Sequence, residues 1–163
     1  MKRILFSLVV TGVLGLYCVS ANAASFVAGT GTQAGTVTDN TTNLMWQQCT
    51  AGWNGAGCAT DDVAVANIYI WEDAITYCEG LLLGGFYDWR LPNVKELKSI
   101  ADMTTSNPAI NTTYFPATAG SLFWSSTSYA QGTTFAWYVN FGSGVTNGTN
   151  KLNTIAVRCV RGQ

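Results

Sequence analysis

The chain has 163 residues, which is enough for one domain with a substantial core. Only 10% of them are charged, 8 basic against 9 acidic with no histidine, whereas aromatic residues reach 12%. This balance excludes the strongly basic surface that binds nucleic acid and other polyanions. The aromatic content and the small net charge also argue against intrinsic disorder.

The first 23 residues have the pattern of a cleavable export signal. Lys2-Arg3 precedes an apolar stretch from Ile4 to Tyr17, and the small-residue motif Ala21-Asn22-Ala23 follows. The apolar stretch is shorter than the ~20 residues that a membrane-spanning helix needs. We therefore expect a signal peptide over residues 1–23, one domain over residues 24–163 and no membrane span. The expected location is periplasmic, at the cell surface or secreted.

Cleavage removes one of the five cysteines and leaves an even number. The remaining four are Cys49, Cys58, Cys78 and Cys159. In an exported chain this indicates two disulfides, and the count alone allows three pairings. Cys49 and Cys58 bracket one glycine-rich loop, whereas Cys78 and Cys159 fall on an expected helix and an expected strand that should pack together. We predict the pairs Cys49–Cys58 and Cys78–Cys159. A zinc site would usually add close-spaced pairs or histidines.

The first half of the mature chain predicts a hairpin and a helix. Residues 25–33 are rich in Gly, Ala and Thr and are expected to be a loose lead-in. Two β-prone runs, 36–39 and 44–47, flank an Asn/Thr turn and predict a hairpin. A helix should begin near Trp71, because apolar residues recur with helical spacing as far as Leu82. Gly84 and Gly85 should end it.

The second half predicts a short helix and then strands. After Pro92, Asn93 can cap a helix and Glu96 stands where a capping box requires it. Beyond residue 120, β-prone runs at 122–126, 135–141 and 155–161 alternate with glycine and asparagine turns. The expected architecture is α+β, with two helices packed on a twisted antiparallel sheet.

Taken in order, these segments resemble the Lcl C-terminal domain family of bacterial proteins. The matching stretches are Gly35-Thr-Val-Thr-Asp-Asn, Asn43-Leu-Met-Trp-Gln, Trp71-Glu-Asp-Ala, Tyr77-Cys78, Gly84-Gly85, Asp88-Trp-Arg-Leu-Pro-Asn, Glu96-Leu, Pro108-Ala-Ile-Asn, Phe115-Pro, Phe123-Trp-Ser-Ser-Thr, Ala136-Trp-Tyr-Val-Asn-Phe and Val157-Arg-Cys-Val-Arg-Gly. The resemblance implies a C-type-lectin-like fold that is related to formylglycine-generating enzymes. Its best-known members are similar to surface adhesins, one of which binds sulfated polysaccharides as a trimer. It also implies that the late loops form the ligand face.

The residues give little support for catalysis. Ser125 and Ser126 have no histidine base with which to build a Ser-His-Asp triad. The four cysteines are assigned to disulfides, so none is left for the reactive pair of a formylglycine-generating enzyme. Nine carboxylates could include a glycosidase pair, but several fit helix-start or capping roles. We expect a protein that is not an enzyme and has no cofactor.

Two polar clusters have a structural and a functional interpretation. Asp61, Asp62 and Asp88 lie in or near loops and have the oxygen ligands that calcium takes, but no EF-hand spacing is present. Solvated turns are the simpler interpretation, and no metal is expected. The Asp88-Trp89-Arg90 cluster is interpreted as part of the fold rather than of a site.

Exposed rings beside amides remain as the candidate recognition chemistry, because sugar faces stack on rings while amides and hydroxyls form hydrogen bonds. The polar stretches 128–134 and 142–150 supply these groups, unless they are plain hairpin tips. The candidate ligand-binding residues are Trp53, Trp124, Tyr129, Asn140, Asn147 and Asn150. Trp46, Trp71, Trp89 and Trp137 are assigned to the core.

We expect an adhesin-like binding domain for a carbohydrate or protein ligand at the cell envelope. It could form a homo-oligomer. The alternative is a structural component of an envelope or fibre assembly.

Overall fold

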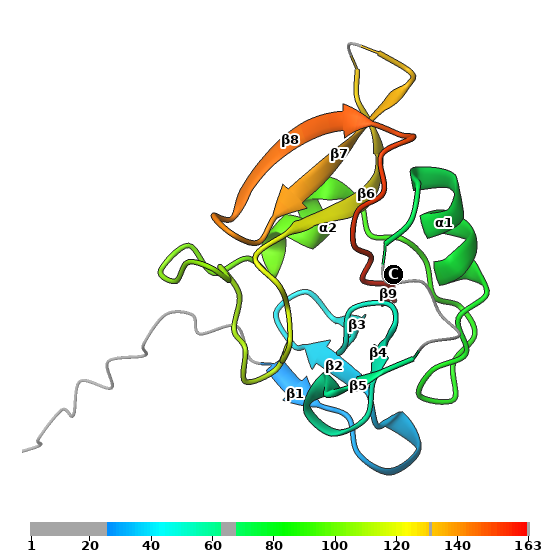
Figure 1. Cartoon of the computed structure of the whole chain (residues 1–163). Coiled ribbons are helices and arrows are strands. Elements are labelled where there is room, and N and C mark those ends of the chain that lie inside the picture. Colours follow the sequence, from blue (N-terminus) through cyan, green and yellow to red (C-terminus); the bar gives the residue numbers. More distant parts are fainter. Residues whose placement is uncertain (1–25, 63–67, 131, 163) are drawn as a thin grey trace, which may run out of the picture.

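A computed structural model describes residues 26–62, 68–130 and 132–162. The predicted signal peptide lies outside these residues. Within the described part of the chain, neither helix has the length and apolar character that crossing a bilayer requires. The architecture is α+β, with two helices and three small antiparallel sheets (Figure 1).

The first sheet contains the three earliest strands and the last strand. Its order is β1 (Phe26–Ala28), β2 (Thr36–Asp39), β3 (Leu44–Gln47) and β9 (Val160–Arg161). The predicted hairpin is confirmed, because Thr36 pairs with Gln47 and Asp39 with Leu44. The turn is closed by Asp39, whose carboxylate accepts hydrogen bonds from the Thr41 backbone N–H and the Thr42 hydroxyl.

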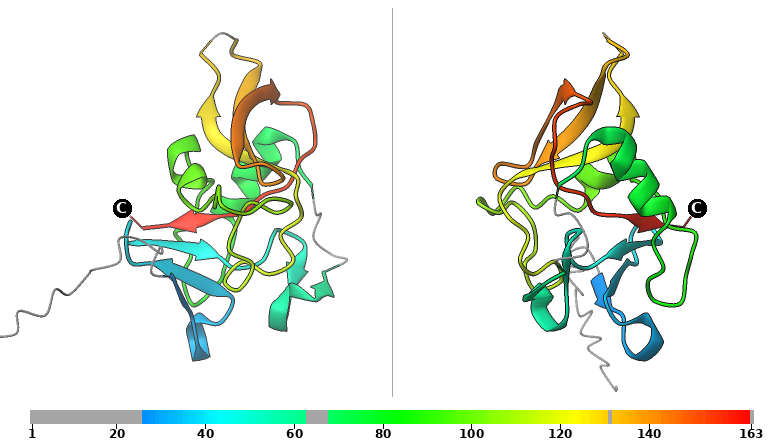
Figure 2. Two further views of the ribbon diagram at one scale, coloured as in Figure 1. Left: turned by 90° about the vertical axis from the view of Figure 1, so that its left-hand side faces the viewer. Right: turned by 45° about the vertical axis from the view of Figure 1, so that its right-hand side comes forward.

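Two sequence predictions for this sheet are wrong. The loose lead-in over residues 25–33 in fact contains β1 and a 3₁₀ turn at Gly31–Gln33, because the buried ring of Phe26 packs against Phe115 at 5.3 Å. The run 155–161 does not join the late strands as a full strand. Only Val160 and Arg161 form β9, which pairs with β3, as the two views of Figure 2 show.

The late sheet has the order β6 (Leu122–Ser128), β7 (Phe135–Asn140) and β8 (Val145–Asn150). A two-stranded sheet pairs β4 (Trp53–Asn54), which lies inside the disulfide loop, with β5 (Thr60–Asp61), which follows it, and a 3₁₀ turn at Ala56–Cys58 lies between the two strands. In β7, Val139 is buried as predicted, but Phe135 is 40% exposed. The apolar face of β7 is therefore covered only at its carboxyl end.

Helix α1 (Trp71–Glu79) is shorter than predicted, because Gly80 rather than Gly84 ends it. Ala74 and Cys78 are buried on its inner face, whereas Leu82 lies beyond the helix and is 74% exposed. Helix α2 (Val94–Ser99) has the predicted capping box: the Asn93 side chain accepts from the backbone N–H of Glu96, and the Glu96 carboxylate accepts from the backbone N–H of Asn93.

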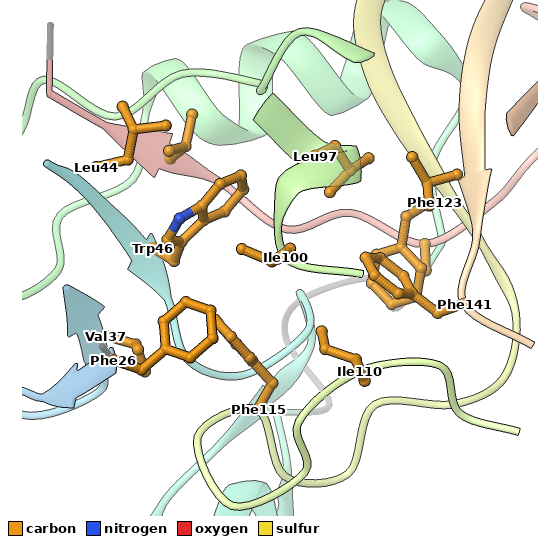
Figure 3. Packing of buried hydrophobic residues seen from close by; sticks show 13 residues of the cluster. Phe26, Val37, Leu44, Trp46, Leu97, Ile100, Ile110, Phe115, Phe123 and Phe141 are labelled. Atoms are coloured by element: carbon orange, nitrogen blue, oxygen red, sulfur yellow. The ribbon is translucent and has the colours of Figure 1, made fainter. Parts of the chain in front are cut away.

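The main core lies between the first and late sheets and includes α2. Leu97 of α2 and Ile100, which caps its end, are buried there with Trp46 of β3 and Phe123 of β6 (Figure 3). A second cluster joins α1 to the late sheet through Trp89, Trp124 and Val157. Disulfides link Cys49 to Cys58 and Cys78 to Cys159, which confirms both predicted pairs.

Candidate functional site

The loop after β3 is rich in glycine and is closed by the Cys49–Cys58 disulfide. Gly52, Gly55 and Gly57 all have positive φ, a conformation that glycine adopts without steric cost. At Gly55 a Cβ atom would lie 2.8 Å from the Thr60 hydroxyl, so the loop also requires the absence of a side chain there. The tight path sets Trp53 on β4, opposite Asp61 of β5.

A pocket of about 520 Å³ lies beside this loop, which is within the usual size range of small-ligand sites. It is formed by the turn after β1, the end of β3, the disulfide loop and the segment after α1. None of its described lining residues is charged. They are Gly29, Ala34, Gly35, Gln47, Gln48, Cys49, Trp53, Asn54, Gly55, Ala56 and Leu83.

The amide side chains of this pocket differ in whether hydrogen bonds within the protein already hold them in place. Gln47 is fixed, because its Nε2 donates to the Tyr77 hydroxyl at 2.9 Å and its Oε1 accepts from the Cys159 backbone at 3.1 Å. Burial raises the pKa of Tyr77, so the phenol is neutral at physiological pH. Gln48 and Asn54 remain for a ligand, Asn54 having only a long 3.5 Å contact to Asp62. A half-buried indole beside two adaptable amides suits stacking and neutral hydrogen bonding.

The late sheet holds a second candidate surface around Tyr129. Its ring lies over Trp137, with the centroids 4.7 Å apart. It also covers Gly148, the cross-strand partner of Trp137, where a Cβ atom would come within 2.6 Å of the Tyr129 ring. Both aromatic residues are partly exposed, and Phe135 lies two residues from Trp137 on the same face of the strand. None of Tyr129, Trp137 and Gly148 lines the pocket beside Trp53.

The prediction that Trp124 is an exposed aromatic contact is wrong. The side chain is wholly buried, and its Nε1 donates to the Tyr69 carbonyl at 2.8 Å. The neighbouring Ser125 is also buried, and its hydroxyl donates to the Trp137 carbonyl. Both residues thus fasten β6 to its neighbours, and neither presents a side chain to a ligand.

The other predicted contacts are dispersed. Asn140 and Asn150 close turns, because their side-chain oxygens accept from the backbone N–H groups of Gly142 and Leu152. Asn147 is exposed on β8, and alternation along the strand puts it on the face opposite Gly148 and the Tyr129 ring. Trp53 lines the pocket at the other end of the molecule. The structure therefore does not bring the six predicted residues together.

Sequence reasoning missed the far wall of the pocket. Leu83 approaches Gly35, where a Cβ atom would lie 3.2 Å from its Cδ1. It is placed by the tight reversal at Gly84-Gly85, which pairs Leu83 with Phe86. The double glycine was visible in the sequence, but it was interpreted as the end of a helix. Its partner across the pocket depends on tertiary packing.

Asp88 has a structural role. Asp88 accepts from Arg161 Nε at 2.7 Å and Nη2 at 3.1 Å, and this hydrogen bonding lowers the pKa of Asp88. Trp89 is buried and its Nε1 donates to the Leu83 carbonyl. Among the described residues, no group of three or more Cys, Asp or Glu side chains is arranged to hold a metal ion.

Comparison with known proteins places most of the chain in one family. No curated protein matches the chain. Residues 35–161 match the Lcl C-terminal domain, a span that runs from β2 through β9 and includes both helices and all four disulfide cysteines. The chain belongs to the Lcl C-terminal domain family.

Proposed function

We propose that this protein is an exported, non-enzymatic binding domain that recognises a neutral carbohydrate in the pocket beside Trp53. The observation that carries the proposal is the composition of that pocket, in which an indole and three amides, two of them adaptable, lie among uncharged residues. Sugars are bound through ring stacking and neutral hydrogen bonds, and such a lining offers both. The C-type-lectin-like fold that the family resemblance implies is part of the same proposal.

Export is supported by the two disulfides, which form and persist in oxidising compartments. An adhesin-like role at the cell envelope is consistent with that location.

A glycan array with the disulfide-bonded mature domain tests the proposal. We expect binding of a neutral glycan that Trp53→Ala abolishes, with the melting temperature close to that of the parent. The matched variant is Tyr129→Ala, which removes the leading ring of the late surface and should leave binding intact. Loss of binding only in Tyr129→Ala would move the site to the late sheet, and no glycan binding at all would contradict the proposal.

One observation favours the second candidate function, a structural component of an envelope assembly. Leu82 and Tyr87 flank the Leu83–Phe86 reversal and are 74% and 83% exposed. Two large apolar side chains on one projecting segment suit a protein–protein contact. In that case the purified domain should self-associate, and Leu82→Ser with Tyr87→Ser should return it to the monomer in sedimentation experiments.

A further inference from the structure

Arg158 is a buried cation without an anionic partner. Its side chain is wholly inaccessible to solvent, and no Asp or Glu side chain in the described part of the chain forms a salt bridge with it. All nine acidic residues lie within that part. Burying an uncompensated charge costs several kcal/mol even after relaxation, on the order of magnitude known for ions in proteins. Arg158 therefore needs compensation from another source.

The protein satisfies only one edge of the guanidinium. Nη2 donates to the Thr118 hydroxyl at 2.8 Å, with longer contacts to the Gln48 carbonyl at 3.3 Å and the Thr50 hydroxyl at 3.5 Å. Nε and Nη1 have no hydrogen-bond partner among the described residues. The rings of Phe115 and Phe123 lie 4.8 and 5.5 Å from the guanidinium carbon and add cation–π attraction, which is smaller than the cost of burial. Burial lowers the pKa of Arg158 to about 9, so the group is still a cation at neutral pH.

A small pocket of about 140 Å³ adjoins this cation. Two of its walls, Thr50 and Phe123, are themselves in contact with the guanidinium. Ala117 and Ala119, which also line it, flank Thr118, the acceptor of the shortest Arg158 hydrogen bond. Arg158 does not itself line the pocket, but Thr50 and Phe123 lie between its guanidinium and the pocket as shared neighbours of both.

The polar side chains of this pocket are all hydrogen-bond donors. Thr50, Ser121 and Trp53 carry O–H or N–H groups, and none of the described lining residues is acidic. The Thr50 hydroxyl accepts from Arg158, and no described residue accepts its own proton, so it can donate into the pocket. The O–H and N–H groups that line the pocket and the nearby buried cation of Arg158 together favour a negatively charged ligand. The volume suits a single small group rather than an oligosaccharide.

We propose that this pocket binds a small monovalent anion, a carboxylate or a halide, held by the Thr50 and Ser121 hydroxyls and by the charge of Arg158. The anion offsets the cost of the buried guanidinium and thereby stabilises the fold. The carboxylate can be a free ion or the end group of a larger molecule. This site is distinct in chemistry from the neutral sugar pocket, although Trp53 lines both.

Thermal unfolding of the disulfide-bonded mature domain tests the proposal. Sodium acetate and sodium bromide are titrated at neutral pH, with the ionic strength held constant by a bulky sulfonate buffer salt. The melting temperature should rise saturably with either anion, as ligand binding to the folded state requires. Acetamide, the neutral analogue of acetate, should have no such effect. An equal response to acetamide, or no saturable response to the anions, would overturn the proposal.

Variants assign the response to this pocket. Arg158→Met keeps much of the side-chain volume without the charge and should abolish the anion response, whereas Arg161→Met removes an arginine paired with Asp88 and should retain it. The double variant Thr50→Val with Ser121→Ala keeps Arg158 and should weaken the apparent Kd at least tenfold. If Arg158→Met does not fold, this double variant tests the site on its own. An unchanged Kd in this double variant would refute the site.

If acetate binds, two further comparisons distinguish a free ion from an end group. Acetate is compared with its uncharged ester, methyl acetate, and a short peptide with a free carboxyl terminus is compared with the same peptide amidated at that terminus. Binding of the free-terminus peptide in place of acetate would identify the end of a larger molecule as the ligand. Asn54 lines the sugar pocket but not the anion pocket, so sugar binding that Asn54→Ala weakens while the anion response persists would separate this site from the proposed function.

Discussion

Arg90 and Glu96 form a bidentate salt bridge at the start of α2. Nη1 lies 2.8 Å from Oε2 and Nη2 lies 2.7 Å from Oε1. The same carboxylate accepts from the Asn93 backbone, and Arg90 Nη2 also donates to the Gly162 carbonyl at 3.2 Å. One glutamate therefore completes a helix cap and, through Arg90, connects it to the C-terminal segment.

Glu96→Gln should lower the free energy of unfolding by about 1 to 2 kcal/mol at neutral pH, because it removes a charge-assisted hydrogen-bond pair and weakens the cap. Burial raises the pKa of Glu96, but the hydrogen bonds from Arg90 and the Asn93 backbone together outweigh it and lower the pKa overall. The stabilisation is thus present above the unfolded-state pKa and is lost as pH falls through the folded-state pKa.

Urea unfolding of both proteins from neutral to acidic pH checks this. The difference between parent and Glu96→Gln should shrink in acid, whereas the control Glu79→Gln, at an exposed position, should stay near the parent throughout. A difference that does not change with pH would show that the ion pair contributes nothing.

The two disulfides should differ in their effect on stability. Cys78–Cys159 spans 81 residues and Cys49–Cys58 spans 9. Loop-closure entropy gives about 4.5 and about 2.7 kcal/mol for loops of these lengths. Double Cys→Ser variants of each pair, compared by denaturant unfolding, should rank in that order. The reverse order would mean that residual structure or strain, rather than loop length, determines the effect.

Gly148→Ala should disrupt the aromatic pair on the late sheet. The added Cβ would lie 2.6 Å from the Tyr129 ring, so the ring has to move away from Trp137. We expect a changed aromatic circular dichroism signal and a loss of about 1 kcal/mol, in the range of overpacking changes. In the Tyr129→Ala background the same substitution should cost little, because the clash is then absent. An equal loss from Gly148→Ala in both backgrounds would refute this account.

Trp89→Ala should cost about 3 to 5 kcal/mol, as truncation of a buried tryptophan usually does. The side chain is 2% exposed and its Nε1 donates to the Leu83 carbonyl at 3.1 Å. Tyr87→Ala, two residues away and 83% exposed, is the control and should change stability by no more than ~0.5 kcal/mol. A Trp89→Ala domain with the parent melting temperature would contradict the core assignment.

The sequence predicted those features that depend on local chemistry. The capping box at Asn93 and Glu96 is specified within four residues, and the β2–β3 hairpin within twelve. Both disulfides followed from the positions of the cysteines on expected elements. Local patterns also explain one error: apolar spacing extended α1 to Leu82, but Gly80 ends the helix, and Leu81 packs against the second cluster from beyond it.

Non-local packing explains the remaining errors. The serines beside Trp124 indicated an exposed strand, but α1 and the Tyr69 carbonyl cover the ring. Nothing near Val160 indicates that its partner is Trp46, more than a hundred residues earlier. The pocket at Trp53 has the same origin, because Leu83 reaches it from a separate part of the chain. Such contacts depend on the whole fold and leave no short-range pattern.

The pairing of β3 with β9 has a consequence for biosynthesis. The first sheet and the link between Cys78 and Cys159 both need residues 159–161, so a chain emerging from its amino-terminal end cannot close its core until this segment arrives. Until then the free thiol of Cys78 could be oxidised or could form a disulfide with a cysteine other than Cys159. The domain thus completes its fold only when the whole chain is available, and premature stop codons anywhere before residue 160 should yield products that proteases remove.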